Sequence, residues 1–96
     1  MAWLEIIEIR SVGSNRELLE SQLQDLIKEL SRETNLLTVK VYRHAALDTD
    51  FSVQIYHNSK KTDTKCSSIC TLLLAALKDF GLVNHTVWIE QEIPVE

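Results

Sequence analysis

The chain has 96 residues, of which 45% are hydrophobic and 25% charged, and its formal net charge is −4. This acidic balance argues against nucleic acids and anionic membrane surfaces as partners, because both attract basic protein faces. No apolar run reaches the roughly 18 residues that span a bilayer, and acids interrupt the N-terminal apolar stretch where a signal peptide would be uniform. We therefore expect residues 1–96 to form a single domain of a cytoplasmic protein, with one modest hydrophobic core.

The first element is a predicted strand over residues 3–11, WLEIIEIRS. It is rich in isoleucine, lacks turn residues and has apolar groups on both faces, which is typical of a central strand. The pattern leaves open whether Leu4 and Ile6 or Ile7 and Ile9 face the core.

The second element is a predicted helix that begins at a capping box formed by Ser14 and Glu17, each bonding the other residue's backbone N–H. The helix is expected to run to about Glu33, with Asn35 as a left-handed cap. Its apolar positions follow the three-four spacing that faces a core. They are Leu18, Leu19, Leu23, Leu26, Ile27 and Leu30.

Two matched strands follow, LLTVKVYRH over 36–44 and FSVQIYHN over 51–58. Both alternate apolar and polar residues, and the short connection AALDTD favours a hairpin. The acids of this connection, Asp48 and Asp50, are interpreted as turn residues. The apolar sets expected to face the helices are Leu37, Val39 and Val41, then Phe51, Val53 and Ile55.

A second helix is predicted to begin near Thr62 to Thr64 and to stop at Gly81, which can adopt the left-handed conformation. Cys66 and Cys70 lie one turn apart in its apolar stripe, so we expect reduced, buried thiols. The whole stripe is Cys66, Ile69, Cys70, Leu73, Ala76, Leu77 and Phe80.

The last element is a predicted strand over residues 85–92, HTVWIEQE, ended by Pro94. Alternation sends Val87 and Ile89 towards the core. Trp88 and Glu90 then lie on the opposite side of the sheet.

The predicted order, β-α-β-β-α-β, is that of ferredoxin-like α+β domains, with a four-stranded antiparallel sheet and both helices on one face. The other face, the open face, must meet water, a ligand or another subunit. An exposed tryptophan among polar groups is typical of interfaces, although an edge tryptophan with no special role is the alternative. The candidate residues of a ligand-binding or dimer face are Lys40, Tyr42, His44, Gln54, Tyr56, Trp88 and Glu90.

Other chemistry finds little support in the sequence. A zinc site needs three or four convergent ligands, but alternation puts His57 and His85 on the helix side of the sheet and His44 on the other. The chain also lacks a G-x-G-x-x-G segment, a phosphate-binding loop and a G-x-S-x-G turn. We therefore expect neither a metal nor a cofactor.

The order of elements, the apolar first strand and the aromatic and polar open face resemble the dimeric α/β-barrel superfamily, which includes antibiotic-biosynthesis-monooxygenase-like proteins. The resemblance covers Trp3 to Ile93 and lies in topology and pattern. It implies a homodimer in which two open sheet faces associate into a barrel. The haem-degrading branch relies on an asparagine on the first strand and a histidine associated with the second helix, and the corresponding segments here have neither.

Three functions remain open at this point. The first is a homodimeric domain that binds a small hydrophobic ligand between sheet and helices or at the dimer face. The second is a cofactor-independent monooxygenase or isomerase for a small aromatic substrate. The third is a regulatory ligand-binding domain. A lining group with a shifted pKa would favour the enzyme.

Overall fold

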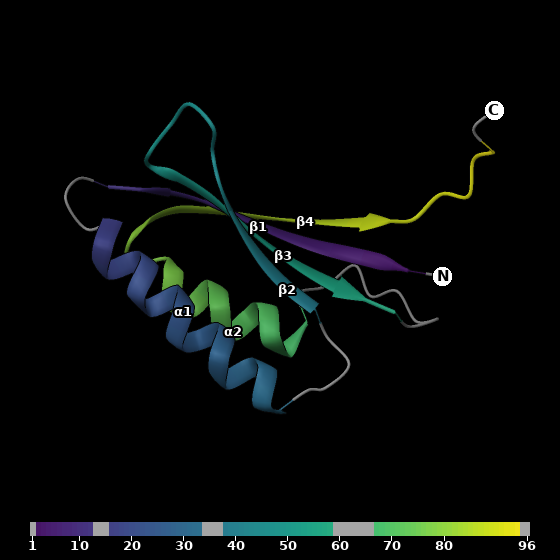
Figure 1. The fold of residues 1–96 in the computed structure, drawn as a ribbon, viewed down its shortest axis with the longest axis horizontal. Coiled ribbons are helices and arrows are strands. Elements are labelled where there is room, and N and C mark those ends of the chain that lie inside the picture. Colours follow the sequence, from purple (N-terminus) through teal and green to yellow (C-terminus); the bar gives the residue numbers. More distant parts are fainter. Residues whose placement is uncertain (1, 13–15, 34–37, 59–66, 95–96) are drawn as a thin grey trace.

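The computed structural model describes residues 2–12, 16–33, 38–58 and 67–94. Its strands form one antiparallel sheet of four, and both helices cover the same face of that sheet (Figure 1). This confirms the predicted α+β class. In chain order the elements are β1 (Trp3–Ser11), α1 (Arg16–Glu33), β2 (Thr38–Arg43), β3 (Asp50–His57), α2 (Ser68–Leu77) and β4 (Gly81–Ile89).

In the sheet the strands lie in the order β2-β3-β1-β4, so β1 is central, as its apolar composition predicts. The structure decides the orientation of β1: Ile7 and Ile9 are buried beneath the helices, whereas Leu4 and Ile6 lie on the open face. The strands β2 and β3 form the predicted hairpin. Its connection is closed by a hydrogen bond from the backbone N–H of His44 to the carbonyl oxygen of Asp50, 2.9 Å long.

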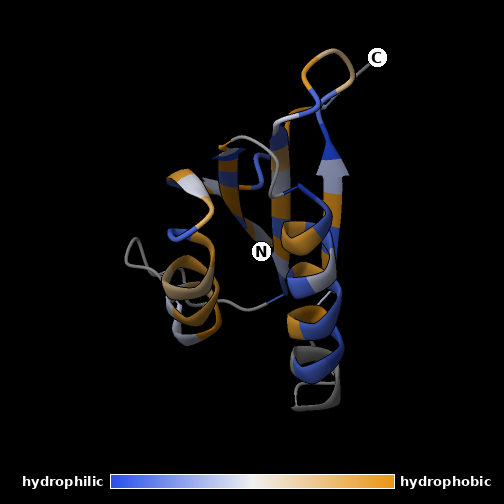
Figure 2. Ribbon diagram, turned by 90° about the vertical axis from the view of Figure 1, so that its left-hand side faces the viewer, coloured by the Kyte–Doolittle hydropathy of each residue, from blue (hydrophilic) through white to orange (hydrophobic). Residues whose placement is uncertain are grey.

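The hydrophobic core lies between the helices and the inner face of the sheet. Hydrophobic and hydrophilic residues alternate along the helices (Figure 2), as expected for elements with one buried side. Burying one large aliphatic side chain contributes about 1.5–3 kcal/mol, so this layer dominates the stability. The core residues are Ile7, Ile9, Leu19, Leu23, Phe51, Val53, Ile55, Cys70, Leu73 and Leu77.

Several apolar residues predicted to face the core are instead largely exposed. Leu18 is on the outer side of α1, and Val41 belongs to β2, an edge strand that the helices cover incompletely. Ile89 is the last residue of β4 and is 43% exposed. The strand itself begins at Gly81 and ends at Ile89, so the predicted span of 85–92 is wrong at both ends.

The start of α2 also differs from the prediction, because the helix begins at Ser68. Ser67 is its N-cap, and the Ser67 hydroxyl oxygen accepts a hydrogen bond of 3.1 Å from the backbone N–H of Cys70. This satisfies one of the free donors of the first turn. The predicted start near Thr62 to Thr64 lies outside the described residues.

Gly81 has a different role from the predicted helix stop. The helix ends at Leu77 with Lys78 as C-cap, and Gly81 opens β4 opposite Ser11. A Cβ atom at position 81 would lie 1.9 Å from the carbonyl oxygen of Arg10. Glycine is therefore required here by the close approach of two strands, not by a left-handed backbone.

Cys70 is disulfide-bonded, so the prediction of a reduced thiol is wrong. Cys66, the Ser14 cap, Asn35 and Leu37 lie outside the described residues. Neither described helix has the length and apolar character needed to cross a membrane.

Candidate functional site

The strand register arranges the open-face side chains in four rows across the sheet. The first row, taken from β2 to β4, is Thr38, Tyr56, Leu4 and Trp88. The second row is Lys40, Gln54, Ile6 and Thr86. The third row is Tyr42, Ser52, Glu8 and Asn84. The fourth contains Asp50, Arg10 and Leu82, with His44 beside Asp50. Tyr56 and Trp88 thus lie at one end of the face, and the charged pair of Arg10 and Asp50 lies at the other.

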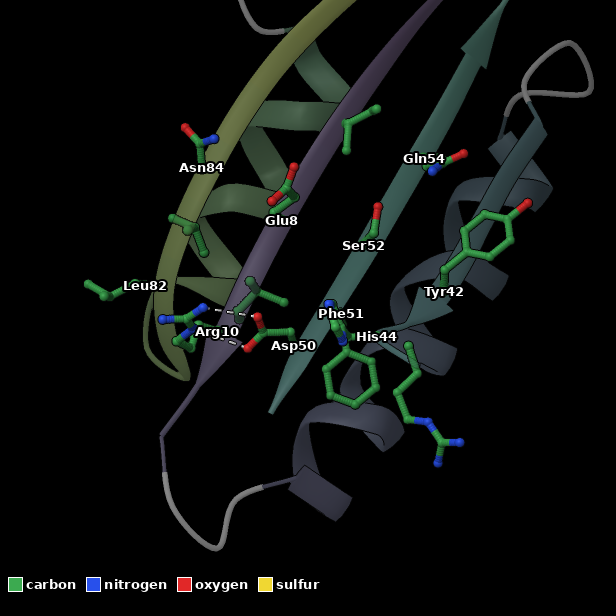
Figure 3. A pocket seen from close by; sticks show the side chains of 14 residues that line it. Glu8, Arg10, Tyr42, His44, Asp50, Phe51, Ser52, Gln54, Leu82 and Asn84 are labelled. Atoms are coloured by element: carbon green, nitrogen blue, oxygen red, sulfur yellow. Dashed lines mark hydrogen bonds and ion pairs between the residues drawn. The ribbon is translucent and has the colours of Figure 1, made fainter. Parts of the chain in front are cut away.

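A depression of about 540 Å³ lies over the last rows of this face (Figure 3). All four strands contribute residues to its lining. Apolar walls come from residues such as Ile6 and Leu82, and polar groups stand between them. Polar and charged lining residues are Glu8, Arg10, Tyr42, Arg43, His44, Asp50, Ser52, Gln54 and Asn84.

The charged end of the depression is held by an ion pair between Arg10 of β1 and Asp50 of β3. Two guanidinium nitrogens of Arg10 donate to the two carboxylate oxygens of Asp50, at 3.2 and 3.3 Å. These hydrogen bonds, and then the charge of Asp50, raise the pKa of Arg10. The hydrogen bonds from Arg10 also lower the pKa of Asp50. Asp50 therefore positions a cation within the site, a role beyond that of a turn residue.

Aromatic and amide groups are linked at the other end. The Tyr56 hydroxyl donates a 2.7 Å hydrogen bond to Oε1 of Gln54, and the Lys40 ammonium lies 5.7 Å from the centre of the Tyr56 ring. Desolvation, with a contribution from Tyr42, raises the pKa of Tyr56. Trp88 donates from Nε1 to the Thr86 hydroxyl at 2.9 Å and is 58% exposed.

His44 is oriented by its own turn. Its Nδ1 accepts hydrogen bonds from the backbone N–H groups of Ala46 and Leu47, both 3.0 Å long. In the neutral ring the proton must then be on Nε2, so that His44 presents a donor to its surroundings.

The structure brings some of the predicted site residues together and separates others. Tyr42, His44 and Gln54 line the depression. Lys40, Tyr56 and Trp88 share the open face but lie outside the depression lining. Glu90 comes after the end of β4, where its backbone N–H donates to the carbonyl oxygen of Ala2 at 2.9 Å.

A second polar site, which the sequence interpretation missed, lies on the opposite side of the sheet. The Glu5 side chain is fully buried, with Oε1 2.6 Å from Nε2 of His57 and Oε2 3.0 Å from Nε2 of His85. The backbone N–H of Ser67 donates to Oε2 at 3.1 Å. We refer to Glu5, His57 and His85 as the Glu5 cluster.

Three adjacent strands build the Glu5 cluster. His57 on β3 is paired with Trp3, and His85 on β4 with Ile7, so both histidines are diagonal neighbours of Glu5 on β1. This confirms that His57 and His85 lie on the helix side and His44 on the other.

The electrostatics of the cluster keep Glu5 ionised. Burial raises the pKa of Glu5, but hydrogen bonds from Ser67, His57 and His85 outweigh burial and bring that pKa below its ordinary value. An ionised carboxylate only accepts, so each imidazole presents Nε2–H to it. On the same side of the sheet, the Trp3 ring stacks on the His57 ring, with ring centroids 3.8 Å apart.

A signal for the cluster was present in the sequence. Within the first strand, Glu5 shares its side with Trp3, Ile7 and Ile9, whereas Glu8 and Arg10 share the other side. The side of the strand with two charged residues, Glu8 and Arg10, is the better candidate for the open face. The other side is then buried, so Glu5 must be an acid with hydrogen-bonding partners in the interior.

Comparisons of the chain with protein-family models, curated proteins and solved structures find no match.

Proposed function

We propose that this chain forms a homodimer through its open sheet face, and that the dimer binds a small hydrophobic molecule in the space that the two faces enclose. One observation carries the proposal: four large side chains stand exposed on this single face. Tyr42, Tyr56, Trp88 and Leu82 are 45%, 37%, 58% and 76% exposed, respectively. Such a concentration of apolar surface on one face marks an interaction site.

The size of the face suits a dimer. Strands of six to nine residues, rising about 3.3 Å per residue and spaced about 4.8 Å apart, give roughly 500 Å² in projection. Protruding side chains increase the accessible area beyond the projection. The face therefore approaches the roughly 800 Å² per partner of a stable interface.

The charge of the face also favours a second copy as the partner. The whole chain carries −4, so two copies repel each other at long range. On the open face, Glu8 and Asp50 are balanced by Lys40 and Arg10, and their formal charges sum to zero. Two identical faces with balanced charges can meet without net repulsion, as a twofold interface requires.

The depression supplies the ligand site. In the dimer its open side would be covered by the partner, which removes water from a space lined by apolar walls and a few polar groups. The Arg10 guanidinium and the amides of Gln54 and Asn84 can bind the polar substituents of the ligand. We expect a small aromatic or otherwise hydrophobic molecule with an acidic or carbonyl group.

Binding is placed first because two of the charged groups of the depression are already paired: both carboxylate oxygens of Asp50 accept hydrogen bonds from Arg10. A cofactor-independent monooxygenase or isomerase is therefore the second candidate function. A regulatory ligand-binding domain would use the same depression to bind its ligand, so it is compatible with the proposal. Face-to-face association also agrees with the resemblance to the dimeric α/β-barrel superfamily and its antibiotic-biosynthesis-monooxygenase-like members.

Sedimentation equilibrium tests the dimer. The wild type should be a dimer at micromolar concentration, and Trp88→Ala should weaken it by about 2 kcal/mol or more, roughly 30-fold in Kd. Leu72→Ala is the matched control, because Leu72 is 60% exposed but belongs to α2, in the layer behind the sheet. A wild type that stays monomeric at high micromolar concentration contradicts the proposal.

The ligand site is tested separately with an anilinonaphthalene sulfonate dye, whose rings and sulfonate match the apolar walls and Arg10. Dye fluorescence should rise on binding to the dimer, and Arg10→Gln should weaken this binding. Leu72→Ala should leave it unchanged. Equal binding by the wild type and Arg10→Gln would place the dye elsewhere.

A further inference from the structure

The strand β4 forms one border of the sheet, and its only neighbouring strand in the described part of the chain is β1 (Figure 1). Such an edge strand leaves a row of backbone N–H and C=O groups unbonded, which makes it a template for another strand. Proteins commonly block their sheet edges with lysines, prolines or bulges. The opposite border agrees with this rule, because β2 carries Lys40 and Arg43 within six residues.

The border formed by β4 lacks these blocking features. Its nine residues, Gly81–Ile89, include no charged residue and no proline. The register between β4 and β1 advances by one residue on each strand throughout, so β4 has no bulge. The longer of the two border strands is therefore the one left open to pairing.

Two backbone hydrogen bonds at the ends of β4 show which of its groups are bonded to β1. The N–H of Val12 donates to the carbonyl oxygen of Phe80, and the N–H of Glu90 donates to that of Ala2, both at 2.9 Å. Hydrogen-bonded pairs recur at every second residue of an antiparallel pair. The even-numbered residues of β4 are therefore the ones that bond to β1.

The odd-numbered residues define the free side of the strand. The backbone N–H and C=O groups of Val83, His85 and Val87 point away from β1, and we call this row the β4 edge. No hydrogen bond from elsewhere in residues 2–12, 16–33, 38–58 and 67–94 reaches it. An extended strand is the partner whose backbone groups repeat at the same spacing, so the β4 edge selects a strand.

The helix behind this border is also uncharged. Among the helices, α2 contacts β4 and β1, whereas α1 contacts β2. The helix α2, Ser68–Leu77, contains no charged residue, and the side chain of Leu72 is 60% exposed. The solvent side of a surface helix normally carries charged or polar residues. An exposed leucine there favours a contact that covers α2 together with β4.

We propose that β4 pairs with β4 of a second copy of the chain, antiparallel about a twofold axis, so that two four-stranded sheets join edge to edge. This contact is separate from the open face and does not rest on the dimer proposed above. Full overlap of the nine residues places His85 opposite His85 of the second copy, and Val83 opposite Val87. All of these positions belong to the β4 edge, so each pair can exchange two backbone hydrogen bonds.

Symmetry and charge favour a second copy as the occupant of this border. A strand that pairs antiparallel with its own copy satisfies the twofold relation of a closed dimer, and both partners present the same groups. The whole chain carries −4, but Gly81–Ile89 and Ser68–Leu77 bring no charge into the contact. Two copies therefore meet here without like charges facing each other.

The size of the border predicts a weak contact. Nine residues at roughly 3.4 Å each give about 30 Å of length, and one sheet layer with one helix layer is roughly 20 Å deep. Each copy would contribute roughly 600 Å², at the small end of specific interfaces. We expect a Kd on the order of 100 µM, so this contact stays open at low micromolar concentration.

Amide hydrogen exchange measured by NMR tests the β4 edge residue by residue. While the edge is unpaired, water reaches the N–H groups of Val83, His85 and Val87, and they exchange rapidly. Between about 20 µM and about 1 mM protein, their exchange should slow by roughly 4-fold, as mass action requires for a Kd of about 100 µM. The N–H groups of Asn84 and Thr86 are internal controls, because they bond to β1 at every concentration.

A proline on the β4 edge removes the pairing without removing a bond to β1. Val87→Pro loses an outward N–H, and proline is tolerated at such positions of edge strands. It should abolish the slowing at Val83 and His85. Val87→Thr keeps the backbone N–H and the β-branched shape, so it is the matched control and should behave as the wild type. Should Val87→Pro not fold, the exchange data of the wild type decide.

Trp88→Ala separates this contact from the open-face dimer. The Trp88 side chain lies on the open face, so its loss should leave the concentration-dependent slowing at the β4 edge intact. Rapid exchange at both concentrations overturns the proposal. Slow exchange that does not depend on concentration also overturns it and indicates cover by another segment or a copurified peptide. Slowing that disappears in Trp88→Ala overturns it as well and assigns the protection to the open-face dimer.

Discussion

In the interior between the sheet and α2, Oε1 of Glu5 lies 2.6 Å from Nε2 of His57. The carboxylate also holds His85 and the backbone N–H of Ser67, so its removal leaves several buried donors without an acceptor. We expect Glu5→Ala to lower the free energy of unfolding by about 3–5 kcal/mol. Glu8→Ala, on the same strand but exposed, should change it by less than about 0.5 kcal/mol. Urea denaturation measures both, and equal midpoints would contradict the expectation.

Substitution of Gly81 should disturb the pairing of β4 with β1. A Cβ atom there meets the carbonyl oxygen of Arg10 at 1.9 Å, and backbone atoms cannot move aside as a flexible side chain can. Gly81→Ala should therefore destabilise the protein by at least about 1–3 kcal/mol, the usual effect of overpacking. Leu72→Ala, at a 60% exposed position of α2 away from the open face, is the control and should have a small effect on unfolding. Thermal unfolding followed by circular dichroism compares the two variants.

The ion pair between Arg10 and Asp50 makes a pH-dependent prediction. Hydrogen bonds from Arg10 lower the pKa of Asp50, so its stabilising contribution is present above the ordinary value of 3.8 and is lost as the pH falls through the lowered value. An NMR titration should place the pKa of Asp50 below 3.8, and Arg10→Gln should raise it. Arg43→Gln, which removes another lining cation, should leave it nearly unchanged. A pKa of Asp50 unaffected by Arg10→Gln would show that the pair does not persist in solution.

Fluorescence quenching can follow the proposed dimer through Trp88. Trp3 is buried, so a Trp3→Phe variant leaves Trp88 as the single tryptophan. Acrylamide should quench Trp88 efficiently in dilute protein and less as the concentration rises through the dimer Kd. Quenching that is independent of concentration while Trp88 stays accessible would exclude this residue from the interface.

Charge at the same face should matter less than the aromatic rings. The Lys40 ammonium lies 5.7 Å from the Tyr56 ring and is exposed, so its contribution is small. Lys40→Ala should change the dimerisation free energy by less than about 1 kcal/mol in sedimentation equilibrium. A loss as large as that of Trp88→Ala would mean that electrostatic contacts dominate the interface.

Local patterns in the sequence predict the elements well, because alternation and the three-four spacing depend on neighbouring residues. The bounds of β1 and the buried positions Leu19, Leu73 and Leu77 follow directly from these patterns. The sequence predicts too early a start for α2, because the threonines near position 62 are as good caps as Ser67 when judged by residue type alone. Selecting between such caps requires the tertiary packing of the helix.

The candidate sites were harder to predict, since they depend on which strands are neighbours. The aromatic residues of the open face follow from alternation, but Arg10 and Asp50 meet only because β1 pairs with β3. Similarly, Glu5 gains its two histidines from β3 and β4, which lie on either side of β1. These contacts join residues 40 to 80 positions apart, and no periodicity within one segment encodes them.

The close contact between Gly81 and the Arg10 backbone sets the register in which β4 pairs with β1. Along a strand, side chains alternate between the two faces, so a slip of one residue exchanges every position of β4. Such a slip would turn Trp88 beneath the helices and carry His85 out to the open face. Only a residue without a side chain fits opposite Ser11, so Gly81 fixes the register of β4. This register keeps His85 beside Glu5 and Trp88 on the open face. The Glu5 cluster and the open face, which lie on opposite sides of the sheet, thus both depend on a glycine at position 81.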